Sequence, residues 1–100
     1  MKNQHPVHVF ATWKVKEGEL ENVLNLLKKV HDESIKENGN LFYKIHQSNS
    51  DVNTLILFEG YRSETAVTEH RNSKHFQELV LGQIVPLLET REIVVTTPLE

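Results

Sequence analysis

The sequence of 100 residues contains no cysteine. This excludes disulfide bonds, thiolate metal sites and a cysteine nucleophile. The chain has 11 lysine and arginine residues and 14 aspartate and glutamate residues. It therefore lacks the excess of positive charge that binds the phosphates of a nucleic acid. No apolar run approaches the ~20 residues of a membrane span, and the start, MKNQHPVHVF, lacks a signal-peptide stretch. We therefore expect a cytoplasmic protein with neither a nucleic-acid nor a membrane partner.

Proline and glycine are also scarce, at three and four residues, and no linker, repeat or low-complexity segment interrupts the chain. Hydrophobic residues make up 38% and charged residues 25%, which is ordinary for a globular protein. A chain of this length builds one modest hydrophobic core. We therefore expect a single domain over residues 1–100.

Four segments have the patterns of β-strands. Residues 7–15 alternate between an apolar face and a more polar one, and residues 41–48 alternate in the same way. Residues 54–62 are almost continuously apolar, as in a strand that is buried on both faces. Residues 92–97 are rich in β-branched side chains, which favour a strand. The apolar face of the first segment is formed by Val7, Val9, Ala11, Trp13 and Val15.

Helical patterns occupy the remaining segments. Over residues 19–38, apolar side chains recur at intervals of three and four, which predicts a long amphipathic helix that stops at Gly39. Ser63 and Ser73 are each placed to cap a shorter helix, and the second of these ends near Pro86.

The resulting order, β-α-β-β-α-α-β, predicts an α+β ferredoxin-like fold with helices on one face of a four-stranded antiparallel sheet. The other face of the sheet then carries too many apolar side chains to be left in water. We expect this face to form a homodimer, packed sheet against sheet. The apolar side chains assigned to it are Phe10, Phe42, Ile56, Phe58, Ile93 and Val95.

One local pattern is more specific. Between Phe58 and Val80, a strand ends in Glu-x-aromatic, a cap and a short helix ending in His follow, and Ser-x-His-Phe opens the next helix. This pattern resembles the hallmark of the antibiotic biosynthesis monooxygenase (ABM) domain family, and residues 39–43 resemble the family's second-strand entry. The residues that carry the pattern are Glu59, Tyr61, Ser63, Ala66, His70, Ser73, His75 and Phe76.

The resemblance implies a dimeric α+β barrel with a pocket between sheet and helices. Members of the family include cofactor-free oxygenases of quinols and polycyclic phenols, an isomerase of a phosphorylated sugar derivative, and haem-degrading proteins. The haem degraders place an Asn, a Trp and a His where this chain has Ala11, His70 and Val80. We therefore expect no haem here.

His70 and His75 are the main catalytic candidates. His75 follows the Ser73 cap at the positive end of a helix, which favours a neutral imidazole that acts as a base. His70 lies at the negative end of the preceding helix, where a cationic donor is favoured. Alternatively, both rings bond to the backbone at the helix junction. In either case we expect the junction to be partly exposed.

Glu59 and Tyr61 lie on the same strand face as apolar residues. Glu59 is therefore a candidate general base with a raised pKa. The alternative is that it pairs with Arg62, Lys44 or a partner chain. Tyr61 is expected to assist in stabilising an anion. Three aromatic side chains are expected either to line a substrate pocket or to pack in the core: Trp13, Tyr43 and Phe76.

The six histidines form no i,i+4 pair and no HExxH motif, so we expect no metal site. Nor does a glycine-rich loop predict a nucleotide, and no cofactor is expected. Three functions remain open: a cofactor-independent monooxygenase of a quinol or polycyclic phenol, which is favoured; a proton-transfer enzyme or isomerase acting on a small phosphorylated metabolite; and a non-catalytic binding module. A closed, mostly apolar pocket favours the first, and converging Lys, Arg or His side chains favour the second.

Overall fold

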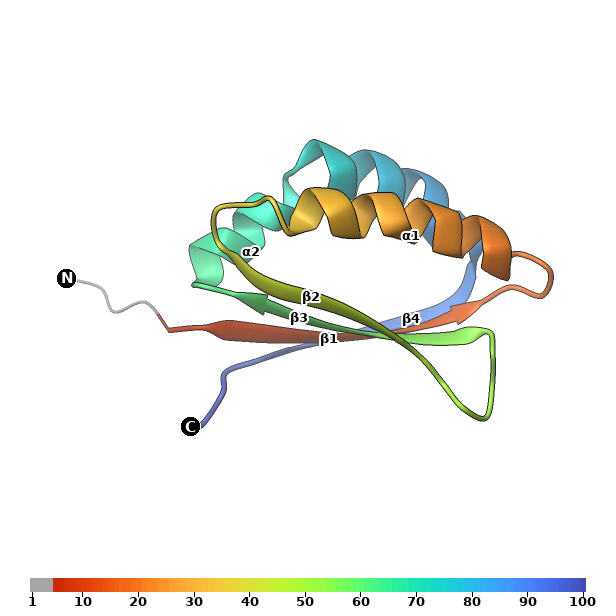
Figure 1. Ribbon diagram of the computed structural model, residues 1–100, viewed down its shortest axis with the longest axis horizontal. Helices are drawn as coiled ribbons and strands as arrows, with labels where there is room; N and C mark the ends of the chain where they lie inside the picture. Colours follow the sequence, from red (N-terminus) through yellow and green to blue (C-terminus); the bar gives the residue numbers. More distant parts are fainter. Residues whose placement is uncertain (1–4) are drawn as a thin grey trace.

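A computed structural model describes residues 5–100, with the helices layered on one face of an antiparallel sheet (Figure 1). The sheet order β2-β3-β1-β4 is ferredoxin-like, and the predicted fold class is confirmed. Residues 1–4 of the expected domain lie outside the described residues. The elements are β1 (Val7–Val15), α1 (Leu20–Ser34), β2 (Asn40–Gln47), β3 (Thr54–Tyr61), α2 (Glu64–Arg71), η1 (Phe76–Ile84), η2 (Val85–Leu87) and β4 (Leu88–Thr96).

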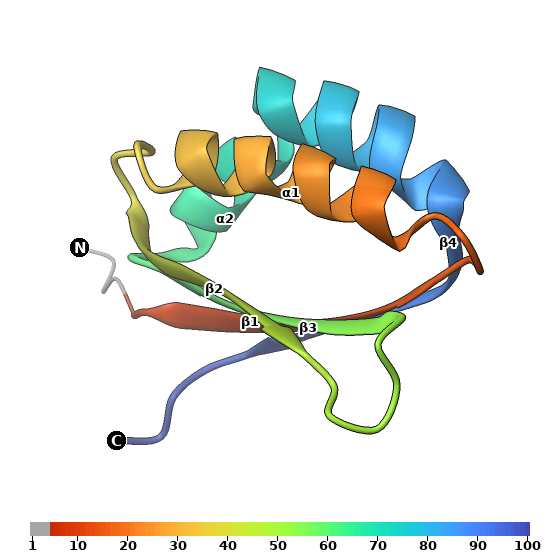
Figure 2. The same cartoon turned by 45° about the vertical axis from the view of Figure 1, so that its right-hand side comes forward.

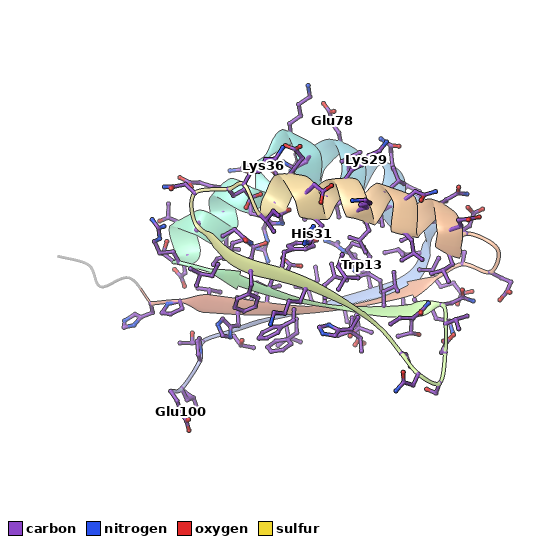
Figure 3. All side chains as sticks on the ribbon, in the orientation of Figure 1. Trp13, Lys29, His31, Lys36, Glu78 and Glu100 are labelled. Carbon is purple, nitrogen blue, oxygen red and sulfur yellow. The ribbon has the colours of Figure 1, made fainter. Side chains whose placement is uncertain are left out.

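The alternation in β1 decides which face of the sheet the helices cover. Its five predicted inward residues are all 5% exposed or less, because every second side chain of a strand points to the same face. Trp13 lies among them, between the sheet and the helices (Figure 3). Figure 2 shows the same two layers from a second direction, with β2 and β3 joined as a hairpin.

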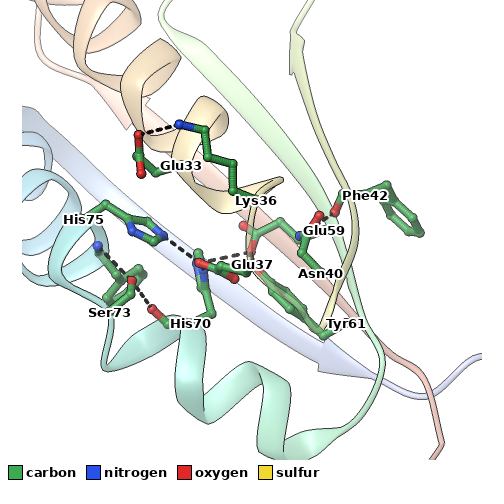
Figure 4. A network of polar contacts seen from close by, with 11 residues as sticks. Glu33, Lys36, Glu37, Asn40, Phe42, Glu59, Tyr61, His70, Ser73 and His75 are labelled. Atoms are coloured by element: carbon green, nitrogen blue, oxygen red, sulfur yellow. Dashed lines mark hydrogen bonds and ion pairs between the residues drawn. The ribbon is translucent and has the colours of Figure 1, made fainter.

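The long helix is shorter than its sequence pattern predicts. It ends at Ser34 rather than at Asn38, and the chain continues through tight turns in which the amide of Glu37 donates to the carbonyl of Ser34 at 3.0 Å. Such i to i+3 bonds tighten the backbone beyond the α-helical pitch. The consequence is that Glu37 belongs to a turn and lies beside the end of α2 (Figure 4).

The two capped helices are present, but the second is of another type. The hydroxyl of Ser63 accepts from the amide of Ala66 at 3.3 Å, as predicted for a cap. Beyond Ser73 the helix η1 is a π-helix, in which the amide of Val85 donates to the carbonyl of Val80 five residues earlier. None of the helices over residues 5–100 is long and apolar enough to cross a bilayer.

The last strand begins at Leu88, not at Glu92. Its register with β1 corrects the sheet face that was assigned to two of its residues. Phe10 lies opposite Val94, and Ala11 lies opposite Ile93. Directly opposed residues of an antiparallel pair point to the same face. The assignment of Ile93 and Val95 to the helix-free face was therefore wrong: Val94 lies there instead.

Candidate functional site

A largely buried cluster of polar side chains lies where the turn after α1, the end of α2, the start of η1 and strand β3 meet (Figure 4). Glu37 comes from the turn, His70 from the last turn of α2, and His75 from the residue before η1. Glu59 and Tyr61 come from the inward face of β3. Residues distant in sequence thus converge on one side of the sheet.

One carboxylate oxygen is hydrogen-bonded to both imidazoles. Glu37 Oε2 lies 2.7 Å from His70 Nδ1 and 2.5 Å from His75 Nε2. An ionised carboxylate only accepts hydrogen bonds, so both of these ring nitrogens donate. In neutral His70 this tautomer leaves Nε2 with a free lone pair. The alternative expectation, that both rings bond to the backbone, is not what the structure has.

The second carboxylate lies on the other side of the His70 ring. Glu59 Oε1 is 3.9 Å from His70 Nε2 and accepts from the Tyr61 hydroxyl at 2.7 Å. Burial raises the pKa of Glu59, although the Tyr61 hydrogen bond opposes this effect. Burial, followed by the charge of Glu59, raises the pKa of Tyr61 far above its ordinary value, so Tyr61 remains a donor. Glu59 pairs with neither Arg62, which donates to the carbonyl of Asn38, nor Lys44, which lies over the Phe42 ring.

Ser73 fixes the spacing of the two histidines. Its hydroxyl donates to the carbonyl of His70 at 2.6 Å and accepts from the amide of Phe76 at 3.2 Å. The end of α2 is therefore tied to the start of η1 by one side chain. The helix-end positions that the sequence predicts for both histidines are correct. The junction is more buried than expected, with His70 only 4% exposed.

A small, partly enclosed cavity of about 30 Å³ lies against this cluster. Its volume suits one or two water molecules and is far below the ~300–1,000 Å³ of typical ligand pockets. The ring of His75 is not part of its wall. Six of the seven residues named from the sequence line it: Trp13, Tyr43, Glu59, Tyr61, His70 and Phe76.

Three further polar residues were missed by the sequence analysis. Glu37 was assigned to the helix, where a carboxylate is an ordinary exposed residue. Arg71 and Arg91 line the cavity, and Arg91 lies opposite Trp13 on the inward face of β4. The strand pattern would have placed Arg91 there, had the strand been extended back to Leu88.

A larger open groove of about 390 Å³ runs between α1 and β2. His31 and Lys28 lie on its α1 side, and Tyr43 separates it from the smaller cavity. The groove contains neither His70 nor Glu59, which both line the smaller cavity.

Glu37, His70 and His75 also form a set that is capable of binding a metal. Their ligand atoms all lie within 4.8 Å of one another, and two histidines with one carboxylate suit several transition metals. Metal bonds of about 2.1 Å keep neighbouring ligand atoms about 3 Å apart or more. The separations of 2.5 and 2.7 Å are those of hydrogen bonds, so this geometry fits a shared proton network.

Known proteins resemble this chain both in sequence and in fold. Two curated proteins that are 30% identical to it are isomerases of (4S)-4-hydroxy-5-phosphonooxypentane-2,3-dione. That of Salmonella typhimurium matches over 74% of this chain and 76% of its own, and that of Yersinia enterocolitica over 66% and 69%.

Solved structures of similar fold extend over nearly the whole chain. Rv0793 from Mycobacterium tuberculosis is 30% identical, with a TM-score of 0.88 over 95% of this chain and 96% of its own. PA3566 from Pseudomonas aeruginosa is 26% identical, with a TM-score of 0.89 over 100% of both chains. The family described as antibiotic biosynthesis monooxygenase matches residues 6–80. The chain therefore belongs to the antibiotic biosynthesis monooxygenase family.

Proposed function

We propose that this protein is a proton-transfer enzyme that isomerises a small hydroxy ketone or dione. The observation that carries the proposal is the position of His70, buried on the cavity wall between Glu37 and Glu59. A carboxylate bonded to one nitrogen of an imidazole fixes its tautomer and strengthens the other nitrogen as a base. This arrangement suits removal of a proton from a carbon beside a carbonyl group.

In the proposed reaction, Nε2 of His70 takes a proton from the carbon adjacent to the substrate carbonyl. The electrons of that C–H bond form a C=C bond, and the carbonyl oxygen receives a proton from Glu59 to give an enediol. The raised pKa of Glu59 favours the protonated acid that this step needs. The second hydroxyl of the enediol, on the carbon that lost its proton, then gives its proton to the Glu59 carboxylate as the new C=O bond forms there. The protonated His70 delivers its proton to the former carbonyl carbon, which restores both side chains and completes the isomerisation with no net oxidation or reduction.

His75 has a supporting role in this proposal. Its ring lies on the far side of Glu37 from the cavity and donates to the oxygen that His70 also uses. The sequence favoured His75 as the base and His70 as the donor. We assign the base to His70 because it is the imidazole that lines the cavity.

Two observations support an isomerase over a monooxygenase. His70, Arg71 and Arg91 converge on the cavity, as expected for a site that binds a polar metabolite. The curated relatives are also named as isomerases of a phosphorylated hydroxy-dione.

The experiment is a turnover assay against a panel of phosphorylated hydroxy ketones and quinols. His70→Asn retains a donor towards Glu37 and removes the inner nitrogen, so turnover should fall by about 10²–10⁴-fold. His31→Asn, in the groove beyond Tyr43, is the matched control and should retain activity. Full activity in His70→Asn would refute the proposal.

A second candidate is the cofactor-independent monooxygenase that the sequence favoured, with O₂ as oxidant. The aromatic side chains of Trp13, Tyr43 and Phe76 on the cavity wall favour it, since they suit a flat ring. The same base would then remove a phenolic proton. Oxygen uptake in step with quinol loss would select this alternative. We expect no stoichiometric metal in either case, and elemental analysis tests that expectation.

We further propose that the protein is a homodimer through the helix-free face of the sheet. Phe58 stacks on Phe10 and contacts Phe42, with ring centroids 4.7 Å apart in each pair, and His8 packs edge-on against Phe42 and Phe58. Phe10 remains 40% exposed and Val94 57% exposed. A cluster of this kind on a small domain is typical of an interface.

A further inference from the structure

The mouth of the cavity carries two arginines that nothing in the proposed proton transfer uses. Arg71 is the last residue of α2 and is exposed, whereas Arg91 lies half-buried on the inward face of β4. Both belong to the wall of the cavity that contains His70 and Glu59. One guanidinium therefore lies at the surface and the other deeper in the same opening.

Neither guanidinium has a counterion close by. Within residues 5–100, the ion pairs involve neither Arg71 nor Arg91. Arg91 has its pKa lowered by burial and then by the charge of Arg71, so the two cations lie close enough to repel each other. Glu59 attracts Arg91 only at longer range. Glu59 is the one carboxylate of the described residues on this wall, and it attracts both guanidinium groups without forming an ion pair with either. Two cations against one buried carboxylate leave a positive opening, which favours the binding of an anion.

Two buried donors point to the same conclusion. Nε of Arg91 and Nε1 of Trp13 are both buried without a hydrogen-bond partner in the described part of the chain. These residues lie directly opposite each other on β4 and β1, and both line the cavity. A buried donor without a partner is unfavourable, so an acceptor of a bound metabolite that bonds to the guanidinium of Arg91 would relieve that cost.

We propose that Arg71 and Arg91 bind the phosphoryl group of a small phosphorylated metabolite at the mouth of the cavity. The planar guanidinium donates two parallel hydrogen bonds to a phosphate, and two such groups match its double negative charge. The cavity of about 30 Å³ cannot take a phosphoryl group, which therefore stays at the mouth. The reacting carbons of the same metabolite then reach inward towards His70. This inference rests on the proposed proton transfer and names the class of its substrate.

The test measures binding separately from turnover. Inorganic phosphate is titrated into the full-length protein by calorimetry, with acetate as the carboxylate probe. Phosphate should bind, and Arg91→Met should weaken its binding by about tenfold or more, because charge-assisted hydrogen bonds are lost. Arg71→Met, at an exposed position, should also weaken it and provides a second variant. Arg62→Met is the matched control and should bind as the wild type does.

The outcomes separate this inference from the proposed function. Equal phosphate binding by wild type, Arg71→Met and Arg91→Met would overturn the phosphoryl site, as would acetate binding as tightly as phosphate. His70→Asn should keep its phosphate affinity while losing turnover. Phosphate binding that depends on the arginines, together with full turnover by His70→Asn, would retain the phosphoryl site and remove the proton-transfer proposal.

Discussion

Glu59 is a buried carboxylate that, within residues 5–100, has a single close hydrogen-bond donor, the hydroxyl of Tyr61. Its side chain shares the inward face of β3 with Leu55 and Leu57, which are fully buried. Burial disfavours the charged form of a carboxylate and so raises its pKa. The acid that the proposed reaction needs is thus maintained at a cost to folding stability whenever Glu59 ionises.

This cost predicts how stability depends on pH. The folded-state pKa of Glu59 lies above its ordinary value of 4.5, so its contribution to stability is complete below that value and is lost as pH rises through the folded pKa. Glu59→Gln does not titrate. The variant should therefore gain unfolding free energy relative to wild type between about pH 4 and about pH 8.

Urea melts of both proteins at the two pH values measure this difference. A gap between variant and wild type that stays constant across the two would show that Glu59 is not penalised for ionising. Turnover by Glu59→Gln should fall in the same samples, because the amide has no proton to donate to a carbonyl oxygen.

Some residues of the site can be predicted from the sequence, and others cannot. His70 and Glu59 can be found from their pattern, because the strand and helix periods place them reliably. Glu37 cannot, since its role depends on a helix that ends at Ser34 through a change in backbone hydrogen bonding. A turn of this kind has no strong signature when the sequence on both sides favours helix.

At the scale of elements, close backbone contacts place α2 over the sheet. A Cβ added at Gly39 would lie 2.4 Å from the Cβ of Ala66 in α2, which no side-chain rotation can relieve. Gly39 directly precedes β2 and lies two residues after Glu37. The contact thus helps to set the distance between Glu37 and the histidine at the end of α2.

Gly39→Ala should consequently destabilise the fold, by about 1–3 kcal/mol as expected for overpacking. Gly82→Ala is the matched control, since its added Cβ meets nothing closer than 3.4 Å and alanine favours helix. Thermal melts compare the two variants. A Gly39→Ala protein as stable as Gly82→Ala would mean that α2 does not depend on this contact.

Element type and order are predictable from this sequence, and element ends are less so. The strand over residues 7–15 was predicted with its final bounds, because strict alternation marks a half-buried strand. The last strand was predicted to begin four residues too late, since Leu88 to Arg91 contains only one β-branched residue, Thr90, and owes its conformation to pairing with β1. Arg91 was missed for the same reason.

At the scale of the whole molecule, the helix-free face of the sheet predicts the assembly. A stable dimer would bury about 1,200 Å² or more in total. Phe58→Glu places a charge in the centre of the aromatic cluster and should dissociate the dimer into chains of 11.6 kDa. Phe10→Glu tests the same face at a more exposed position.

Sedimentation velocity at micromolar concentration measures this directly. Leu81→Glu, at an exposed apolar position on η1 in the helix layer, is the control and should remain dimeric. A wild-type protein that sediments only as the monomer would remove the proposal, and so would dissociation by Leu81→Glu alone.

The central claim is that His70 moves a proton between carbons of the substrate. Proton NMR in D₂O, with a phosphorylated hydroxy ketone turned over by the panel assay, follows that proton. The base exchanges its proton with solvent, so the account predicts deuterium at the carbon that receives it, and loss of this signal in His70→Asn by about 10²-fold or more. Equal deuterium incorporation by wild type and His70→Asn, or full turnover by His70→Asn, would contradict the claim.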